Sequence, residues 1–169
     1  GLKCESVAAD LTTFVEGRQL DDDASIMIRM SENVKGNLSI SQIATGQENN
    51  FTISIYGEKG ALHWSQENPN YAKFSKIGSA DQIITRGGAI QNKNAYAPTR
   101  IPPGHPEGYL EGFAQIYSDA ADIILNHENK NQLLELLPGG DSGIQIMKFI
   151  NASVNSSKNN SIWTDLNSI

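Results

Sequence analysis

One segment of the sequence, from Pro102 to Glu128, limits the possible folds more than any other. Pro106 suits the first position of a helix, and Glu107 and Glu111 place carboxylates near the positive end of the helix dipole. Apolar side chains then recur at helical spacing in two neighbouring rows: Tyr109, Phe113, Ile116, Tyr117, Ala120 and Ile124 beside Leu110, Ala114, Ala121 and Leu125. The pattern predicts an amphipathic helix of roughly 20 residues, which needs a broad apolar surface to lie on.

The first third of the sequence predicts strands that supply such a surface. Through residues 6–14, one row of alternating residues is Val7, Ala9, Leu11 and Thr13, which is typical of a half-buried strand. Similar patterns predict further strands at 24–30, 38–44, 51–56 and 61–65. The connections are short and polar, with Gly36 expected at a positive φ and Glu58 and Lys59 expected to be turn residues only. Successive short loops favour one antiparallel meander whose apolar face receives the long helix.

The other face of this sheet is predicted to be polar without being strongly charged. Its side chains include Arg29, Ser39, Ser41, Thr52 and Ser54. An antiparallel sheet can leave one face to water or to another subunit. We therefore expect an α+β fold, with an open, mainly antiparallel β-sheet and helices packed on one face, in a single domain spanning residues 1–169.

Fewer regular elements are expected between the strands and the long helix. Residues 66–100 look mostly irregular, with short strands or excursions at 71–77 and 82–86. A connection of this length often carries function or covers a site.

A second helix is expected near the end of the chain. Residues 129–137 are expected to form a short helical or irregular link, and Asp141 or Ser142 then caps the helix. Its buried side is expected to consist of Ile144, Met147, Ile150 and Val154. Polar residues 153–161 should break the helix, and Trp163 should pack back onto the fold.

Composition excludes several classes of function. The 169 residues can bury the core of one domain. A net charge of −6 without a cluster of Lys and Arg excludes a nucleic-acid-binding surface. No apolar run approaches the roughly 20 residues of a membrane helix. The single cysteine, Cys4, excludes an internal disulfide framework and a cysteine-based zinc site, and the aspartates at 21–23 are expected to form a solvated loop.

The sequence shows no complete catalytic constellation, so any chemistry would depend on single residues such as the three histidines. His63 alternates with apolar neighbours in a predicted strand and is expected to be structural. His127 lies near the end of the long helix, where a cation is favourable. His105 precedes the helix between Gly104 and Pro106, where free backbone N–H groups and a fixed imidazole would suit an oxygen-rich ligand. The structural alternative is that His105 only holds the loop that leads into the helix.

Four segments resemble one family: LDDDA at 20–24, IYGEKGALHWSQENPN at 55–70, RGG at 86–88 and GHPEGYLEGFAQIY at 104–117. The chain is similar to the C-terminal half of a bacterial branch of the Gfo/Idh/MocA oxidoreductases, some of which act on levoglucosan-type sugars. The resemblance implies a glyceraldehyde-3-phosphate dehydrogenase-like C-terminal domain, with an open sheet that commonly forms the subunit interface. It also implies an N-terminal Rossmann domain that binds NAD or NADP.

In that family, the glycine fingerprint, the catalytic lysine and the catalytic histidine would all lie before Gly1. The sequence begins without an initiator Met or a secretory signal and leads almost at once into a strand pattern. We therefore expect the C-terminal piece of a longer, cytoplasmic oxidoreductase, with no catalytic, cofactor-binding or metal-binding residue of its own.

The resemblance makes His105 the first candidate for a substrate contact, because the GHPEGY turn of such proteins faces the active-site cleft. Arg86 and Gln42 are weaker candidates, with a surface salt bridge and a polar residue on the sheet face as the structural alternatives. The expected function is substrate binding and subunit assembly in a sugar or polyol dehydrogenase, as a homo-oligomer through the open sheet face. The alternative is a stand-alone dimerisation or carbohydrate-binding module without redox activity.

Overall fold

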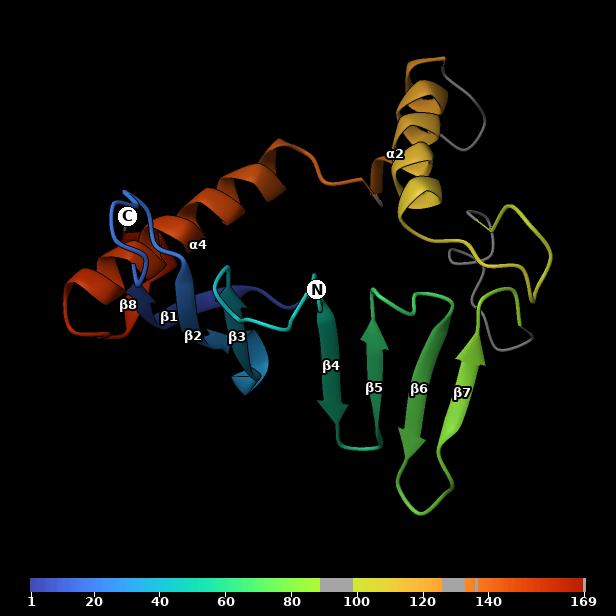
Figure 1. The fold of residues 1–169 in the computed structure, drawn as a ribbon, viewed down its shortest axis with the longest axis horizontal. Helices are drawn as coiled ribbons and strands as arrows, with labels where there is room; N and C mark the ends of the chain where they lie inside the picture. The colour runs from blue at the N-terminus through green and yellow to red at the C-terminus, as the bar shows by residue number, and fades with distance from the viewer. Residues whose placement is uncertain (89–98, 126–132, 136, 169) are drawn as a thin grey trace. The chain divides into compact units, whose positions relative to one another are not determined.

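The computed structural model describes residues 1–88, 99–125, 133–135 and 137–168, which form two compact units (Figure 1). Unit 1 consists of Gly1–Gly46 and Leu134–Ile169, and unit 2 of Gln47–Leu133. Each unit contains one open, antiparallel, four-stranded sheet. The predicted α+β class is therefore confirmed, but the strands are divided between two sheets and do not form one meander. No described helix is long and apolar enough to cross a membrane.

The sheet of unit 1 has the order β3-β2-β1-β8. Its strands are β1 (Cys4–Thr12), β2 (Asp23–Met30), β3 (Lys35–Ser41) and β8 (Thr164–Asp165). Alternation holds as predicted, because Val7 lies opposite Ile28 and Ala9 opposite Ile26, so their side chains share one face. The first and last segments of the chain thus meet in one sheet, which the local pattern did not predict.

The connection between β2 and β3 differs from the prediction. A short 3₁₀ turn, η1 (Ser31–Asn33), joins the strands, and the positive φ angles belong to Glu32 (58°) and Asn33 (59°). Gly36 instead lies inside β3. The expectation for Gly36 was wrong because the turn is completed three residues earlier.

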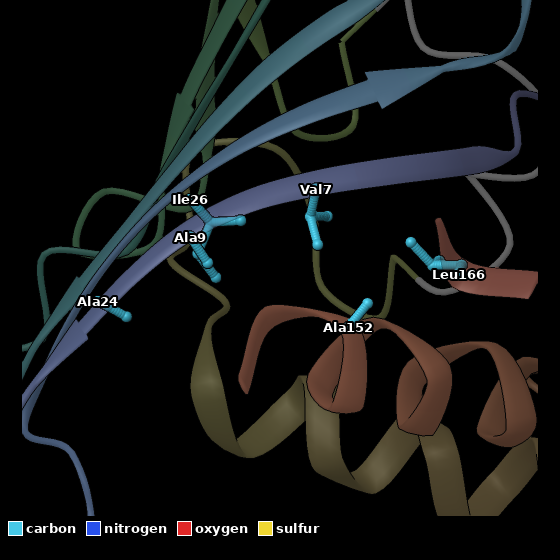
Figure 2. Packing of buried hydrophobic residues seen from close by; sticks show 6 residues of the cluster. All are labelled: Val7, Ala9, Ala24, Ile26, Ala152 and Leu166. Carbon is cyan, nitrogen blue, oxygen red and sulfur yellow. The ribbon is translucent and has the colours of Figure 1, made fainter. Parts of the chain in front are cut away.

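Helix α4 (Gly140–Lys158) covers the apolar face of this sheet. Figure 2 shows the resulting core, in which Ala152 of α4 faces Val7, and Leu166 of the closing 3₁₀ turn η2 (Leu166–Ser168) lies beside them. The buried residues of α4 are Ala152, Ser153 and Ser156. The predicted buried side was wrong for three of its four residues: Ile144 and Met147 are each 56% exposed and Ile150 is 46% exposed, whereas Val154 is half-buried.

The polar end of α4 does not break the helix, because two serines bond to the free edge of β1. Strand β8 pairs only with Ser6 and Val7, so the backbone groups of Ala9 and Leu11 project beyond it. The Ser156 hydroxyl accepts the Ala9 N–H at 2.8 Å. The Ser157 hydroxyl accepts the Leu11 N–H at 3.0 Å. Their small side chains allow close approach, and their oxygens complete the hydrogen bonding of the strand edge.

The three adjacent aspartates do not form a solvated loop, because Asp22 is only 4% exposed. Its carboxylate accepts the N–H groups of Phe14 and Val15 at 2.8 and 3.0 Å, and Arg18 lies 3.2 Å away. The Phe14 N–H holds the pKa of Asp22 below its usual value, with the Val15 N–H and Arg18 acting in the same direction. Asp22 therefore organises the loop between β1 and β2.

Two smaller expectations in unit 1 hold. Trp163 packs back onto the sheet, with the Arg29 guanidinium carbon 3.8 Å from the centre of its ring. Cys4 is half-buried against the core, and burial raises the pKa of its thiol. By strand register, Arg29, Ser39 and Ser41 lie on the face opposite α4, as predicted.

Unit 2 contains a meander of four strands in sequential order. These are β4 (Thr52–Gly57), β5 (Gly60–Ser65), β6 (Tyr71–Lys76) and β7 (Gln82–Thr85). The short strands expected at 71–77 and 82–86 are confirmed as β6 and β7, and they complete the sheet. Glu58 and Lys59 form the turn between β4 and β5, as expected. Gly60 is required there, because a Cβ atom would lie 2.6 Å from the Ser75 carbonyl oxygen.

The long helix, α2 (Tyr109–Ile124), is shorter than predicted. It begins after Gly108, whose N–H donates to the Glu111 carboxylate at 2.8 Å, so Pro106 is not its first residue. None of the sixteen residues of α2 is buried, and the helix that covers a sheet is α4 instead. His127 and most of the expected link at 129–137 lie outside the described residues.

Candidate functional site

A pocket of about 340 Å³ lies in unit 2, where the loop before α2 meets the ends of two strands. Tyr71 begins β6, Thr85 ends β7, and the loop contributes Gly104, His105 and Pro106. Asn70 and Arg86, each adjacent in sequence to one of these strand ends, also line the pocket. The structure thus brings together two of the three predicted site residues, His105 and Arg86.

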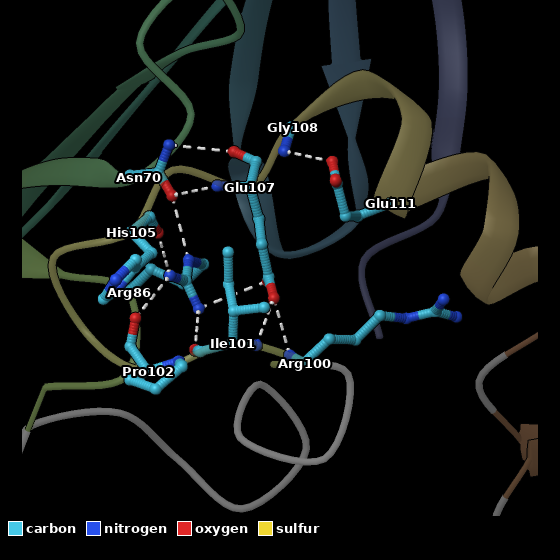
Figure 3. A network of polar contacts seen from close by, with 9 residues as sticks. All are labelled: Asn70, Arg86, Arg100, Ile101, Pro102, His105, Glu107, Gly108 and Glu111. Carbon is cyan, nitrogen blue, oxygen red and sulfur yellow. Dashed lines mark hydrogen bonds and ion pairs between the residues drawn. The ribbon is translucent and has the colours of Figure 1, made fainter.

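Arg86 is fully engaged by protein groups (Figure 3). Its Nε–H donates to the Asn70 side-chain oxygen at 2.9 Å. Its Nη1 lies 3.1 Å from the Ile101 carbonyl and 3.2 Å from a Glu107 carboxylate oxygen. Its Nη2 donates to the carbonyl oxygens of Pro102 and His105. A guanidinium has five N–H donors, and each of them has a partner here.

Glu107 is the acidic partner of Arg86 and is 9% exposed. One oxygen of its carboxylate accepts two backbone N–H groups, from Arg100 and Ile101, both at 2.7 Å. The other oxygen faces Arg86. The pair is therefore an ion pair that joins the end of β7 to the loop before α2, and the salt bridge considered for Arg86 is present but lies mostly below the surface.

Asn70 connects this loop to the start of β6. Its Nδ2 donates to the Glu107 carbonyl at 2.8 Å, and its Oδ1 accepts the Glu107 N–H at 3.0 Å. The same Oδ1 also accepts from Arg86. Neither Asn70 nor Glu107 was predicted from the sequence to be a partner of Arg86. The one indication in the sequence was that Asn70, Arg86 and Glu107 all belong to the family-like segments 55–70, 86–88 and 104–117.

His105 is an exposed side chain on an anchored backbone. Its N–H donates to the Pro102 carbonyl at 3.3 Å, and its carbonyl accepts from Arg86. No hydrogen bond or ion pair joins its ring to another residue in the described part of the chain. The imidazole is thus available to a ligand in the pocket.

The predicted supply of free backbone N–H groups beside His105 was wrong. The N–H groups of His105, Glu107 and Gly108 are all bonded within the protein, and Pro106 has none. The Gly108 N–H lowers the pKa of the Glu111 carboxyl, which caps the first turn of α2. Binding at this pocket would therefore depend on side chains.

The other candidates lie elsewhere. Gln42 belongs to unit 1, where it is exposed just after β3 and its N–H donates to the Asp22 carbonyl at 2.8 Å. His63 lies in β5, and its Nδ1 is 2.8 Å from the Ser54 hydroxyl on the neighbouring strand. A structural role for His63 was predicted, and this contact agrees with it.

Comparison with known proteins gives a consistent result. Residues 1–63 match the GFO/IDH/MocA C-terminal domain. An uncharacterised oxidoreductase of Bacillus subtilis, YfiI, is 28% identical over 168 residues, which is 97% of this chain and 43% of that protein. The family match ends within β5, so Arg86 and His105 lie beyond it.

Solved structures extend the similarity over nearly the whole chain. An oxidoreductase from Sinorhizobium meliloti is 44% identical with a TM-score of 0.90, covering 96% of this chain and 46% of its own. An inositol dehydrogenase homologue from Azotobacter vinelandii, complexed with NADH and myo-inositol, is 24% identical with a TM-score of 0.87 and shares the fold; the match covers 97% of this chain and 44% of that one. This chain thus spans less than half the length of the proteins it matches, and it is similar to the C-terminal domain of the GFO/IDH/MocA oxidoreductases, which residues 1–63 match.

Proposed function

We propose that this chain is the substrate-binding and subunit-assembly domain of an NAD(P)-dependent dehydrogenase that acts on a sugar or polyol hydroxyl. The observation that carries the proposal is the unbonded imidazole of His105 on an anchored loop at the pocket. An imidazole can donate to or accept from a hydroxyl group. The similarity to an inositol dehydrogenase homologue, solved with NADH and myo-inositol, supports the same class of ligand.

The electrostatics of the pocket favour an uncharged ligand. The positive charge of Arg86 is balanced by the Glu107 carboxylate, and all its N–H donors are bonded. The other polar groups lining the pocket belong to Asn, Tyr, Thr and His side chains. Such groups hydrogen-bond hydroxyls well but offer no free cation for a phosphate or carboxylate. A neutral sugar or polyol therefore fits better than a sugar phosphate.

The part of the chain that the structure describes does not fit a nicotinamide dinucleotide. Every described strand pair is antiparallel, so the described residues contain no parallel βαβ unit. The start of α2 is occupied by Glu111, and Asp141 lies in the first turn of α4, where its charge would oppose a pyrophosphate. In the proposed enzyme, a Rossmann domain preceding Gly1 holds NAD or NADP and supplies the catalytic lysine and histidine.

The remaining parts of the proposal concern assembly and location. The face of the unit 1 sheet that lies opposite α4 would pair with another subunit, as the family resemblance implies. The dehydrogenase would work in the cytoplasm, where the nicotinamide pool is available to it. Gln42, on unit 1, remains a proposed substrate contact of the complete enzyme.

Activity measurements on the complete encoded protein test this function. Reduction of NAD⁺ or NADP⁺ is followed with myo-inositol, levoglucosan and other neutral polyols, and with phosphorylated sugars for comparison. We expect turnover with at least one neutral compound and much weaker turnover with its phosphorylated form. Binding of a polyol without any reduction would favour the stand-alone carbohydrate-binding module. Neither binding nor reduction with any compound would contradict the proposal.

A further inference from the structure

Three segments that are distant in sequence meet at Arg86. Asn70 precedes β6, Arg86 follows β7, and the loop at 100–107 leads towards α2. The Arg86 guanidinium bonds to three carbonyl groups of this loop, those of Ile101, Pro102 and His105. A single side chain, that of Arg86, thus holds the backbone of the loop that presents His105.

The shape of the guanidinium matters more here than its charge. Its donors form a rigid planar fork, whereas a lysine ammonium is a compact charge on a flexible stem. A lysine could still face the Glu107 carboxylate, but it could not hold three carbonyls and Asn70 at the same time. Glycine at position 87 allows the close approach, because φ there is +73° and a Cβ atom would lie 3.0 Å from the Pro103 ring.

Glu107 fixes the other side of the same loop. Its carboxylate holds the N–H groups of Arg100 and Ile101, while its own backbone N–H and carbonyl are both bonded by Asn70. Arg86 and Glu107 are only 14% and 7% exposed in their side chains. Neither has a donor or charge left for a ligand, although Arg86 lines the pocket.

We propose that Arg86, Glu107 and Asn70 form a positioning clamp that holds the imidazole of His105 at the substrate hydroxyl. This inference rests on the proposed function, because it assumes that His105 binds the substrate. It assigns Arg86 a different role from the direct contact expected from sequence. The three residues act on the substrate only through the loop and its histidine.

The experiment uses four single variants and one double variant of the complete encoded protein. Arg86→Lys keeps the charge and removes the fork, and Glu107→Gln keeps the shape and removes the charge. His105→Ala removes the imidazole and leaves the clamp. Asp81→Asn is the matched control, since it breaks the exposed Lys73–Asp81 ion pair of the same unit, 2.6 Å long, without touching the loop. Each variant is assayed for kcat/KM with the best neutral polyol and for hydrogen–deuterium exchange of peptides covering residues 100–108.

The clamp variants should have a less ordered loop at residues 100–108 and a lower catalytic efficiency. Arg86→Lys and Glu107→Gln are expected to speed exchange in residues 100–108 and to lower kcat/KM by up to about tenfold, no more than His105→Ala does, because misplacing the imidazole forfeits at most the hydrogen bond it makes. His105→Ala should lower kcat/KM without changing exchange in the loop, and Asp81→Asn should change neither. Combining His105→Ala with Glu107→Gln should cost no more than His105→Ala alone, because the clamp acts through that imidazole.

Two results would overturn the inference while the proposed function stands. One is an Arg86→Lys protein with normal exchange and normal kcat/KM, which would mean that charge alone suffices. The other is additive losses in the double variant, which would mean that the clamp acts independently of His105. A wild-type protein that neither binds nor oxidises any polyol would instead contradict the proposed function itself.

Discussion

Asp22 is a buried carboxylate that accepts hydrogen bonds from two backbone N–H groups and from Arg18. These partners favour the charged form, so the pKa of Asp22 is lower in the folded protein than in the unfolded chain. A lowered carboxyl pKa stabilises the fold above the unfolded pKa, and this contribution disappears as the pH falls through the folded pKa.

Replacing Asp22 should therefore change how stability depends on pH. Between about pH 5 and pH 2, wild-type protein should lose more free energy of unfolding than Asp22→Asn, which has no carboxylate to protonate. Urea denaturation at several pH values measures this difference. Asp21→Asn, at the exposed neighbouring position, is the control and should behave like wild type. Parallel pH profiles for Asp22→Asn and wild type would show that the loop does not depend on this charge.

The site shows which residues local sequence can and cannot identify. His105 was predicted from its neighbours Gly104 and Pro106, and it lies at a pocket with an unbonded ring. The sequence predicts for Glu107 only that its carboxylate lies near the positive end of the helix dipole. Its true partners lie 21 residues away at Arg86 and 37 residues away at Asn70. No spacing rule connects such positions, so the network was visible only once the backbone had brought them together.

At the level of elements, the helix α4 is fixed to β1 by hydroxyl groups. The Ser156 Oγ accepts from Ala9 and donates to the Ile162 carbonyl at 2.7 Å, and Ser156 is fully buried. Ser153 is also buried, but its hydroxyl donates only to the Phe149 carbonyl of the same helix. The two serines thus differ in what they hold together.

Ser156→Ala should destabilise the protein by about 1–3 kcal/mol, because the buried Ala9 N–H would lose its acceptor. Ser153→Ala should lie within about 0.5 kcal/mol of wild type, since the Phe149 carbonyl keeps its place in the helix and alanine is a good helix former. Chemical denaturation of both variants provides the comparison. Equal losses would show that the sheet-edge bonds contribute nothing specific.

Strands were easier to predict than the roles of the helices. Alternation located the strands and their faces, since burial in a sheet follows a period of two. Helical spacing placed both helices, but their apolar rows were poor guides to burial: α4 packs through Ala152, Ser153 and Ser156, while the apolar row of α2 remains exposed. Close helix–strand packing favours small side chains, and serine supplies them with a hydrogen bond that hydrophobicity cannot indicate.

For the whole molecule, the face of the unit 1 sheet opposite α4 is the proposed subunit interface. Met27 lies on this face by strand register and is 51% exposed. We expect the complete encoded protein to sediment as a homo-oligomer and Met27→Asp to weaken the assembly, because a two-fold contact would bring the new charge near its own copy. Leu20→Asp, a loop position that is 78% exposed, is the control. A wild-type monomer at high concentration would contradict this assembly.

Steady-state kinetics with both substrates test most directly whether this chain binds the polyol and another domain binds the nicotinamide. In the complete encoded protein, His105→Ala should raise the KM for the polyol by about tenfold, which corresponds to one lost hydrogen bond. The KM for NAD⁺ or NADP⁺ and the melting temperature should stay at their wild-type values, because the loop backbone remains held by Arg86. A lower melting temperature with unchanged polyol kinetics would contradict a substrate role for this domain at His105.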